Sequence, residues 1–428
     1  METHLAEFIR DTPAGLEAQE ILRKCVHCGF CTATCPTYQL LGDELDGPRG
    51  RIYLIKQVLE GAVAGTSTRL HLDRCLTCRA CETTCPSGVQ YGRLLDIGRG
   101  VVAAQVPRSG VDRVKRATLR QLLPRPGLFA PMVKIGQQLG PLLPQSLRTK
   151  VPPVRSSGPW PAAAHGRHML ALAGCVQPAL LPNINSAAAR VLDRLGIEVR
   201  ETAAGCCGAV RFHLDDVEGA RTAARRNIDA WWPMIEAGIE AIVITASGCG
   251  TLVKDYGHLL AEDRRYAGKA ARVAELAKDV GEVVAAEKDR LLELLARCPP
   301  AATRLAFQSP CSLQHGQKIR GLIEPLLGAA GFELTVVADA HLCCGSAGTY
   351  SLLQPEIAGR LRDEKLRALN AGRPAAIASA NVGCIAHLQA DSDVPVRHWI
   401  EFLDERLAAC ETREAGSAIA AASTIGAC

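Results

Sequence analysis

The stretch Cys25-Val-His-Cys28-Gly-Phe-Cys31-Thr-Ala-Thr-Cys35-Pro36 carries four thiols at intervals of three, three and four residues. The same string returns as Cys75-Leu-Thr-Cys78-Arg-Ala-Cys81-Glu-Thr-Thr-Cys85-Pro86. A thiolate at every third position lets one compact turn present three ligands to a metal cluster. The proline that follows lacks an N–H and has a fixed φ, so it ends the turn. The two strings therefore predict two metal sites within one small domain.

The spacing C-x2-C-x2-C-x3-C-P is that of the ligand runs of two-cluster ferredoxins, in which the fourth cysteine ligates the other cluster. We therefore expect two 4Fe-4S clusters with exchanged fourth ligands. The expected ligands are Cys25, Cys28, Cys31 and Cys85 for the first cluster, and Cys75, Cys78, Cys81 and Cys35 for the second. One such string alone also suits zinc, because paired thiolates bind zinc. Two complete strings favour iron–sulfur clusters and a protein that moves electrons.

The composition is typical of an intracellular globular protein. The chain has 428 residues, 48% of them hydrophobic, and a net charge of +5, which gives little support to a nucleic-acid partner. Its 19 cysteines imply no disulfide framework, and residues 1–11 contain no signal-peptide core. No run of residues is long and apolar enough for a transmembrane helix. We expect a cytoplasmic protein. If it works at the inner face of the cell membrane, it should be held there peripherally.

The N-terminal part divides into a ferredoxin domain, residues 12–100, and a basic linker, residues 101–165. Apolar residues recur at helical spacing between Pro48 and Gly61, which favours a mostly helical ferredoxin domain over the small β-rich kind. The linker holds ten Lys and Arg, ten Pro and a single acid, Asp112, and should be irregular with short helical pieces. Its charge suits either a solvated linker or a contact surface for anionic lipid or an acidic partner subunit.

The rest of the chain contains one α/β unit twice. Each copy has a strand-like run that ends on a cysteine, a helical stretch, a second strand, a Cys-Cys-Gly string and a third apolar run before Gly-Cys. This alternation predicts parallel α/β units, with the cysteines just after strands, where open sheets place their ligands. We expect domains at 166–290 and 302–408, packed as a pseudo-symmetric pair. A disordered tail, residues 409–428, should follow, and its Cys410 and Cys428 are not expected to be ligands.

Eight cysteines occupy equivalent positions in the two copies. They are Cys175, Cys206, Cys207 and Cys249, and Cys311, Cys343, Cys344 and Cys384. Cysteine also serves as a small buried residue, but packing alone does not predict the same four positions twice. Zinc, a redox dithiol or a further iron–sulfur centre would each explain them. We expect at least one copy to bind a metal centre, in which case the chain holds more than the roughly eight irons of two 4Fe-4S clusters.

The order of these motifs resembles the iron–sulfur subunits of flavin-linked 2-hydroxyacid oxidation and of heterodisulfide reductase. Longer strings are similar to the iron–sulfur subunits of bacterial glycolate oxidase, and the resemblance extends to about residue 408. These strings are Cys25–Tyr38, Gly42–Arg51, Asn227–Trp232 and Leu342–Gly348.

The resemblance implies an FAD-containing catalytic subunit that oxidises glycolate to glyoxylate, with D-lactate as a further candidate substrate, and a second flavin-domain subunit. Electrons would pass through this chain toward a membrane acceptor such as a quinone. The chain is then a subunit of an oxidoreductase, with no catalytic residue and no cofactor site beyond its clusters. The absence of G-x-G-x-x-G and G-x4-G-K-[ST] strings agrees with flavin chemistry on a partner. The alternative is a disulfide- or quinone-reducing subunit of the heterodisulfide-reductase type, with its own site in the Cys-Cys-Gly half.

The family pattern ends each Cys-Cys-Gly domain in C-x2-C, and this chain departs from it. Leu252 and His387 stand where the last cysteines would be, so each copy is one thiolate short. His387 is a candidate substitute ligand, although helix capping or packing is an alternative role for it.

Several other side chains are candidates for tuning or proton transfer. His27 lies beside Cys28, where it could tune a cluster potential or simply occupy a surface loop. His315 and His341 flank the cysteines of the second copy and could supply protons at a quinone exit site. The pair Trp231–Trp232 is expected to pack a helix rather than relay electrons.

Overall fold

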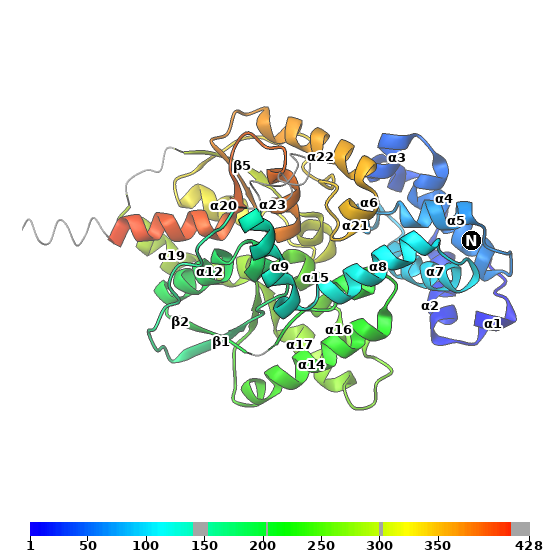
Figure 1. The fold of residues 1–428 in the computed structure, drawn as a ribbon, viewed down its shortest axis with the longest axis horizontal. Coiled ribbons are helices and arrows are strands. Elements are labelled where there is room, and N and C mark those ends of the chain that lie inside the picture. The colour runs from blue at the N-terminus through cyan, green and yellow to red at the C-terminus, as the bar shows by residue number, and fades with distance from the viewer. Residues whose placement is uncertain (140–152, 203, 299–302, 412–428) are drawn as a thin grey trace, which may run out of the picture.

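The computed structural model describes residues 1–139, 153–202, 204–298 and 303–411. A helical N-terminal domain lies against two α/β units, and a pair of helices crosses the face turned to the viewer in Figure 1. The predicted fold class is confirmed: a mostly helical ferredoxin domain precedes two repeated parallel α/β units.

The N-terminal domain is built from short helices around one apolar core. They are α1 (Glu7–Arg10), α2 (Pro13–Lys24), η1 (Phe30–Thr34), α3 (Pro36–Leu41), η2 (Glu44–Asp46), α4 (Pro48–Leu59), α5 (Thr66–Asp73), α6 (Ala80–Thr84) and α7 (Tyr91–Gln105). Helix α4 is the one expected between the two cysteine strings. Helices α2, α3 and α4 each begin with proline, whose missing N–H is not needed there. Pro36 therefore both ends the first cysteine loop and starts α3.

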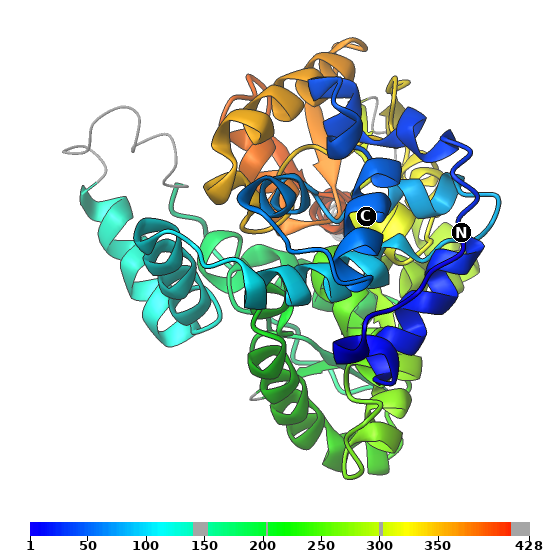
Figure 2. The ribbon, with the colours of Figure 1, turned by 90° about the vertical axis from the view of Figure 1, so that its right-hand side faces the viewer.

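The basic segment after α7 is more regular than predicted. It forms α8 (Gly110–Leu122) and α9 (Pro126–Leu139), two helices of 13 and 14 residues. Pro107 and Pro124 lie outside the two helices and Pro126 begins α9, so of the prolines in residues 101–139 only Pro131 stands inside a helix. In Figure 2 this helical pair stands out from the body of the molecule. Residues 140–152 of the expected linker lie outside the described residues.

Each α/β unit contains a four-stranded parallel sheet with the same strand order. The first has the order β2-β1-β3-β4, and the second has the order β6-β5-β7-β8. The strands are β1 (Arg167–Ala171), β2 (Ile197–Glu201), β3 (Ile242–Ile244), β4 (Ala277–Asp279), β5 (Arg304–Gln308), β6 (Glu333–Leu334), β7 (Ala376–Ser379) and β8 (Val396–His398). The sequence indicates three strands in each copy. The fourth strands, β4 and β8, were not predicted, because they are three residues long and include charged positions.

Helices cover both sheets. In the first unit they are α11 (Gln177–Leu180), α12 (Asn183–Arg194), α13 (Ala209–His213), α14 (Val217–Glu236), α15 (Ser247–Val253), α16 (Tyr256–Leu259), α17 (Ala267–Leu276), α18 (Val280–Ala286) and α19 (Lys288–Leu295). In the second they are η4 (Ser312–Gly316), α20 (Ile323–Ala329), α21 (Tyr350–Leu353), α22 (Pro355–Asn370) and α23 (Val382–Gln389), followed by a helix over residues 399–411. One hydrophobic core runs through both units and includes Val283 of the first and Ile323 and Leu403 of the second. The two repeats therefore form a single packed body.

The C-terminal helix corrects the boundary of the predicted tail. Residues 409–411 continue this helix, because Leu403, Leu407 and Cys410 recur at helical spacing and are buried. Cys410 forms a disulfide with Cys298, a pair that sequence analysis did not predict. Cys428 and the remainder of the tail lie outside the described residues.

Candidate functional site

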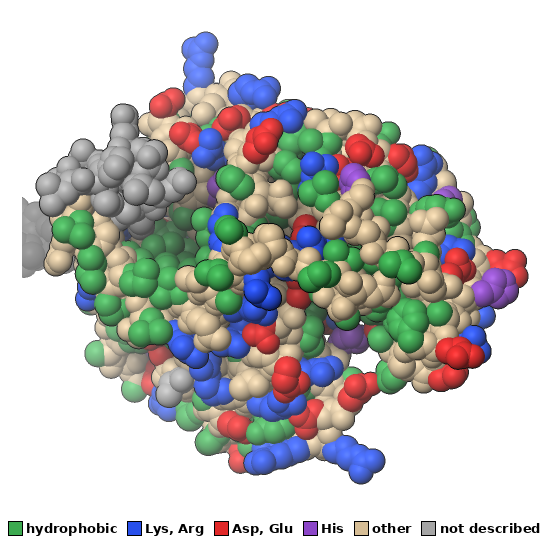
Figure 3. Space-filling model, turned by 45° about the vertical axis from the view of Figure 1, so that its right-hand side comes forward, with side chains coloured by type: hydrophobic (Ala, Val, Ile, Leu, Met, Phe, Trp, Pro, Cys, Tyr) green, Lys and Arg blue, Asp and Glu red, His purple; other side chains and the backbone are tan. Residues whose placement is uncertain are grey.

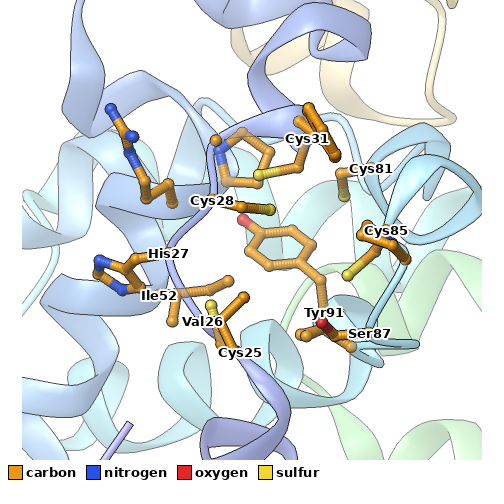
Figure 4. Close-up of a pocket in the computed structure, with 16 residues that line it drawn as sticks. Cys25, Val26, His27, Cys28, Cys31, Ile52, Cys81, Cys85, Ser87 and Tyr91 are labelled. Atoms are coloured by element: carbon orange, nitrogen blue, oxygen red, sulfur yellow. The ribbon is translucent and has the colours of Figure 1, made fainter.

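The first thiol group surrounds a cavity at the surface of the N-terminal domain. Figure 4 shows Cys25, Cys28, Cys31 and Cys85 around this cavity, which also has Ile52 and Tyr91 in its wall. The cavity encloses about 440 Å³, part of it open to solvent. Cys25 is buried, whereas the Cys28 residue is exposed. Burial, together with the neighbouring Cys25, Cys28 and Cys85 thiols, raises the pKa of Cys31 to about 11.

The second thiol group lies deeper in the domain. It combines Cys75, Cys78 and Cys81 of the second string with Cys35 of the first. Burial raises the pKa of Cys78 and of Cys81 well above the usual value, and Cys35 and Cys75 add to both shifts. Cys35 thus lies with the second string, and Cys85 with the first. These neighbour relations group the eight thiols as four and four, and Cys81 of the second group also lines the first cavity.

The spacing of these sulfurs fits a cluster better than a single ion. Among the described residues, no three cysteine sulfurs all lie within 4.8 Å of one another. A tetrahedral zinc ion bound at about 2.3 Å would require sulfurs about 3.8 Å apart. A 4Fe-4S cluster holds each thiolate on a different iron and so needs a wider arrangement. The residues present therefore fit iron–sulfur clusters.

A buried ionic network, centred on Asp46, lies beside the second thiol group. The Asp46 carboxylate is fully buried, and two guanidinium groups and an imidazole surround it. Its Oδ1 lies 3.0 Å from His71 Nδ1 and 3.4 Å from Arg51 Nη2, and its Oδ2 lies 2.8 Å from Arg74 Nη1. This network holds η2, α4 and α5 together, next to the second thiol group.

Arg51 connects this network to the cluster loop. Its side chain is 1% exposed, and it donates hydrogen bonds to the His71 carbonyl at 2.7 Å and to Thr37 Oγ1 at 3.1 Å. Thr37 Oγ1 in turn lies 3.3 Å from Cys35 Sγ. Arg51 belongs to one of the strings that resemble the family, but its role could not be predicted, since the burial of a charged side chain cannot be seen in the sequence. Close packing requires a glycine at Gly50, because an added Cβ would lie 2.2 Å from the Glu44 carbonyl oxygen.

The four thiols of the first repeat form a row. Hydrogen bonds from Cys175 and then Cys207 lower the pKa of Cys206, and Cys207 also contacts Cys249. All but Cys249 are buried. The order of the row is therefore Cys175, Cys206, Cys207 and Cys249.

The second repeat reproduces this row. Cys311 Sγ lies 3.7 Å from Cys343 Sγ, and Cys344, the next residue, interacts with Cys384. The four positions that recur in sequence therefore also recur in space. A row of four thiols, with no three mutually close, can hold more than one metal atom.

The glycine after each Cys-Cys pair is required by the backbone. Gly345 has a φ of +89°, and a Cβ there would lie 2.6 Å from the Ala358 carbonyl oxygen. Gly208, in the first repeat, has a φ of +100° and similarly approaches the Ala220 carbonyl at 3.1 Å. The Cys-Cys-Gly string thus places both thiols against a helix with no room for a side chain.

The variant Gly345→Ala is expected to destabilise the protein by about 2–4 kcal/mol. The left-handed φ accounts for about 1–2 kcal/mol and the overlap with the Ala358 carbonyl for the rest. Urea unfolding of the intact chain measures the change. Gly348→Ala is the matched control, because Gly348 has a φ of +63° but open space around its Cβ position. Equal losses in the two variants would show that the close approach to α22 is unimportant.

The second thiol group of the N-terminal domain adjoins the second repeat. The Cys311 thiol contributes to the raised pKa of Cys78, after burial. Cys343 shares an apolar cluster with Leu76, against which Cys78 and Cys311 also pack. Thr83 Oγ1 lies 3.0 Å from His315 Nδ1, and this contact joins the same two domains. The two thiol sites are therefore neighbours across this interface.

The thiol sites of the two repeats also face each other. Asn381 donates from Nδ2 to Cys384 Sγ at 3.5 Å and accepts at Oδ1 from the Gly248 N–H at 3.2 Å. Gly248 immediately precedes Cys249. A single amide side chain therefore connects the last thiol of one row with the residue before the last thiol of the other.

The histidines take mostly structural positions. His387 Nε2 lies 3.2 Å from the Ala358 carbonyl oxygen, which agrees with a packing role rather than with ligation. His315 Nε2 lies 2.9 Å from the His341 carbonyl oxygen. His27 packs edge-on against Tyr53, and its Nε2 is buried without a hydrogen-bond partner.

The remaining two sequence candidates pack as expected. Trp231 is fully buried in the core of the first repeat, and Trp232 lies beside it with its Nε1 donating to Glu236 at 2.7 Å. Leu252, at the position where the family pattern has a cysteine, is also a buried core residue.

Comparison with known families matches the three domains separately. Residues 21–89 match the family described as "4Fe-4S dicluster domain", and residues 169–254 and 305–389 each match "Cysteine-rich domain". The chain is thus an iron–sulfur protein that joins a dicluster ferredoxin domain to two cysteine-rich domains.

Curated relatives match this chain over different shares of its length. The glycolate oxidase iron-sulfur subunit of Escherichia coli (strain K12) is 55% identical over 409 residues, which cover 95% of this chain and 99% of the relative. The probable glycolate oxidase iron-sulfur subunit of Bacillus subtilis (strain 168) is 30% identical over 403 residues, 86% of this chain and 88% of the relative. Lactate utilization protein A of the same strain is 24% identical over 239 residues, 54% of this chain and 97% of the relative. The chain belongs to the family of glycolate oxidase iron-sulfur subunits, so the resemblance found in the sequence is confirmed.

Proposed function

We propose that this chain is the electron-transfer subunit of a flavin-dependent complex that oxidises glycolate to glyoxylate, with D-lactate as a second candidate substrate. Substrate oxidation takes place at the FAD of a partner subunit, and a second flavin-domain subunit completes the complex. The observation that carries the proposal is the continuous series of thiol sites from the protein surface to the second repeat. The relatives named for glycolate oxidase support the substrate, and those named for lactate utilization support the alternative.

The grouping of the thiols in the N-terminal domain supports two ligand sets. We assign Cys25, Cys28, Cys31 and Cys85 to a first 4Fe-4S cluster, and Cys75, Cys78, Cys81 and Cys35 to a second. Such clusters take up and release one electron at a time. The chain's own residues hold the two sites close together and exclude water from the deeper one.

We further propose that the first site receives electrons from the flavoprotein. It is open to solvent at Cys28, and large hydrophobic side chains surround it: Val26 is 69% exposed, Phe30 60% and Tyr53 47%. The second site is instead covered by the second repeat. An exposed apolar rim around a redox site is suited to docking another protein.

The variant Phe30→Asp is expected to weaken binding of the flavoprotein subunit about 5- to 30-fold, because a hydrophobic contact is replaced by a charge. The dissociation constant of the two purified subunits measures this effect. Val336→Asp is the control, since Val336 is 91% exposed but lies in the second repeat, away from the rim. An unchanged dissociation constant for Phe30→Asp would move the docking surface elsewhere.

Reconstitution tests the function itself. The anaerobically purified chain alone should not be reduced by glycolate. Addition of its FAD-containing partner should make glycolate bleach the visible absorption of the clusters and generate their reduced EPR signals. Glycolate oxidation by the isolated chain would contradict the proposal and favour a catalytic site within it.

We also propose that at least one thiol row, Cys175–Cys206–Cys207–Cys249 or Cys311–Cys343–Cys344–Cys384, binds a further metal centre. The neighbourhood of Cys78 and Cys311 supports the second row as the next step for electrons. Iron analysis should then give clearly more than the roughly eight irons that two 4Fe-4S clusters contain. A value of eight would contradict this part of the proposal.

We propose, finally, that the complex works as a peripheral assembly at the inner face of the cell membrane and delivers electrons to a quinone. Among the helices of the described residues, none combines the length and apolar character needed to cross a bilayer. Attachment through a surface of the protein is the arrangement compatible with that finding.

A further inference from the structure

Helix α9 presents an apolar face to solvent. None of its residues is buried, although Leu128, Met132, Ile135 and Leu139 recur at intervals of four, three and four residues. These four side chains are 51%, 52%, 54% and 46% exposed. A helical stripe of this kind normally faces a core. Helix α11 contacts α9, but it leaves this stripe about half exposed to solvent.

Helix α8 has the reverse of the usual arrangement. Its buried residue is Arg116, whereas Val111 is 81% exposed and Val114 is 65% exposed. Arg116 and the preceding Arg108 form ion pairs with Asp73 of α5 and Asp215 after α13. These pairs attach α8 to both the N-terminal domain and the first repeat. The apolar side chains of α8 are therefore held outward by a charged anchor.

The exposed charges on this pair of helices are all basic. Arg113, Lys115, Arg120, Arg125 and Lys134 have no ion-pair partner among the described residues, and the one acid, Asp112, is paired with Arg108 and Arg116. Figure 3 shows hydrophobic side chains together with Lys, Arg and some Asp and Glu side chains on the side of the molecule that it presents. We call residues 106–139 the basic arm. Apolar side chains between unpaired cations complement a surface that is both apolar and anionic.

We propose that the basic arm is the membrane-docking surface of this protein, with α8 and α9 lying in the plane of an anionic bilayer. This inference rests on the proposed peripheral location and identifies the surface responsible for it. The four α9 side chains, with Val111 and Val114, would enter the boundary between headgroups and acyl chains, while the five cations contact lipid phosphates. Helix α9 has 14 residues, so it is too short to span the bilayer and is suited to lying on it.

Vesicle flotation with the full-length, cluster-loaded chain tests the proposal. The wild-type chain is expected to bind vesicles of phosphatidylglycerol and phosphatidylcholine at least tenfold more strongly than vesicles of phosphatidylcholine alone. The double variant Met132→Asp/Ile135→Asp should lose at least tenfold of that binding. The variant Arg113→Gln/Lys115→Gln/Lys134→Gln should lose the preference for the anionic lipid and its sensitivity to salt.

Matched controls separate the arm from general effects. Val63→Asp and Val336→Asp introduce the same charge at valines that are 92% and 91% exposed outside the arm, and should leave vesicle binding unchanged. Because all the substituted α9 residues are exposed, the unfolding transition of each variant should match that of the wild type.

Three outcomes would overturn the assignment. If Met132→Asp/Ile135→Asp bound vesicles as strongly as the wild type, membrane contact would lie on another surface, and the proposed peripheral location would still hold. Equal binding to neutral and anionic vesicles would remove the role of the cations. Absence of vesicle binding, with the arm shielded in a complex with the flavoprotein, would assign the arm to a protein partner instead. Glycolate-dependent reduction of the clusters, measured on the same variants after addition of the FAD-containing partner, reports on electron transfer independently of all three.

Discussion

The variant Cys35→Ser is expected to lose the second cluster, although Cys35 belongs to the first cysteine string. Its thiol lies with Cys75, Cys78 and Cys81, and contributes to the raised pKa values of Cys78 and Cys81. Removal of this thiolate leaves three protein ligands for a cluster that needs four. The iron content should fall by about four atoms at most, the content of one cluster.

EPR spectroscopy identifies which cluster is lost. Cys28→Ser defines the spectrum of a chain damaged at the first site, and Cys78→Ser defines damage at the second. Cys35→Ser should then match Cys78→Ser, and Cys85→Ser should match Cys28→Ser. The opposite correspondence would show that each string keeps its own cluster, and the exchange of fourth ligands would be wrong.

The variant Arg51→Met is expected to destabilise the N-terminal domain by about 3–5 kcal/mol, the usual cost of removing one partner of a buried ion pair. The Arg51 side chain is 1% exposed, and its removal leaves the His71 carbonyl and Thr37 Oγ1 without a buried donor. Unfolding in urea, followed by the visible absorption of the clusters, measures this loss.

Redox titration provides a second readout for Arg51. A buried cation near Cys35 and Cys75 favours the reduced, more negative cluster, so its removal should lower the potential of the second cluster and leave the first unchanged. Arg49→Gln is the control, because the pair Arg49–Glu44 is 37% and 41% exposed and should contribute less than about 1 kcal/mol. Equal effects of the two variants would exclude a special role for Arg51.

The regular parts of this molecule could be read from the sequence because they depend on local periodicity. The spacing of the cysteine strings, the α4 pattern and the Cys-Cys-Gly string are all properties of short segments. The sequence could not reveal β4 and β8, since each is short and has a charged residue at its centre, so neither appears as an apolar run. The length of α8 and α9 was not predicted either, because the segment is rich in proline and only the structure shows that most of these prolines lie outside the helices or at a helix start.

The residues of each candidate site could be predicted, but the order in which the sites lie next to one another in space could not. Repetition in the chain marked all sixteen cysteines of the four sites. The contact between Cys78 and Cys311, and the connection of the two rows through Asn381, join residues more than 130 positions apart. The Asp46–Arg51 network was missed for a similar reason, since charged residues are normally exposed.

The sequence by itself thus indicated which thiols are candidate metal ligands, because ligand spacing within a turn is a local matter. It also determined that the Cys-Cys-Gly unit occurs twice. Only the tertiary structure decided which site is open to solvent, which site is covered by the second repeat, and which apolar helix face is left without a partner. Those properties depend on burial and on contacts between distant segments, and they exist only when the domains are packed together.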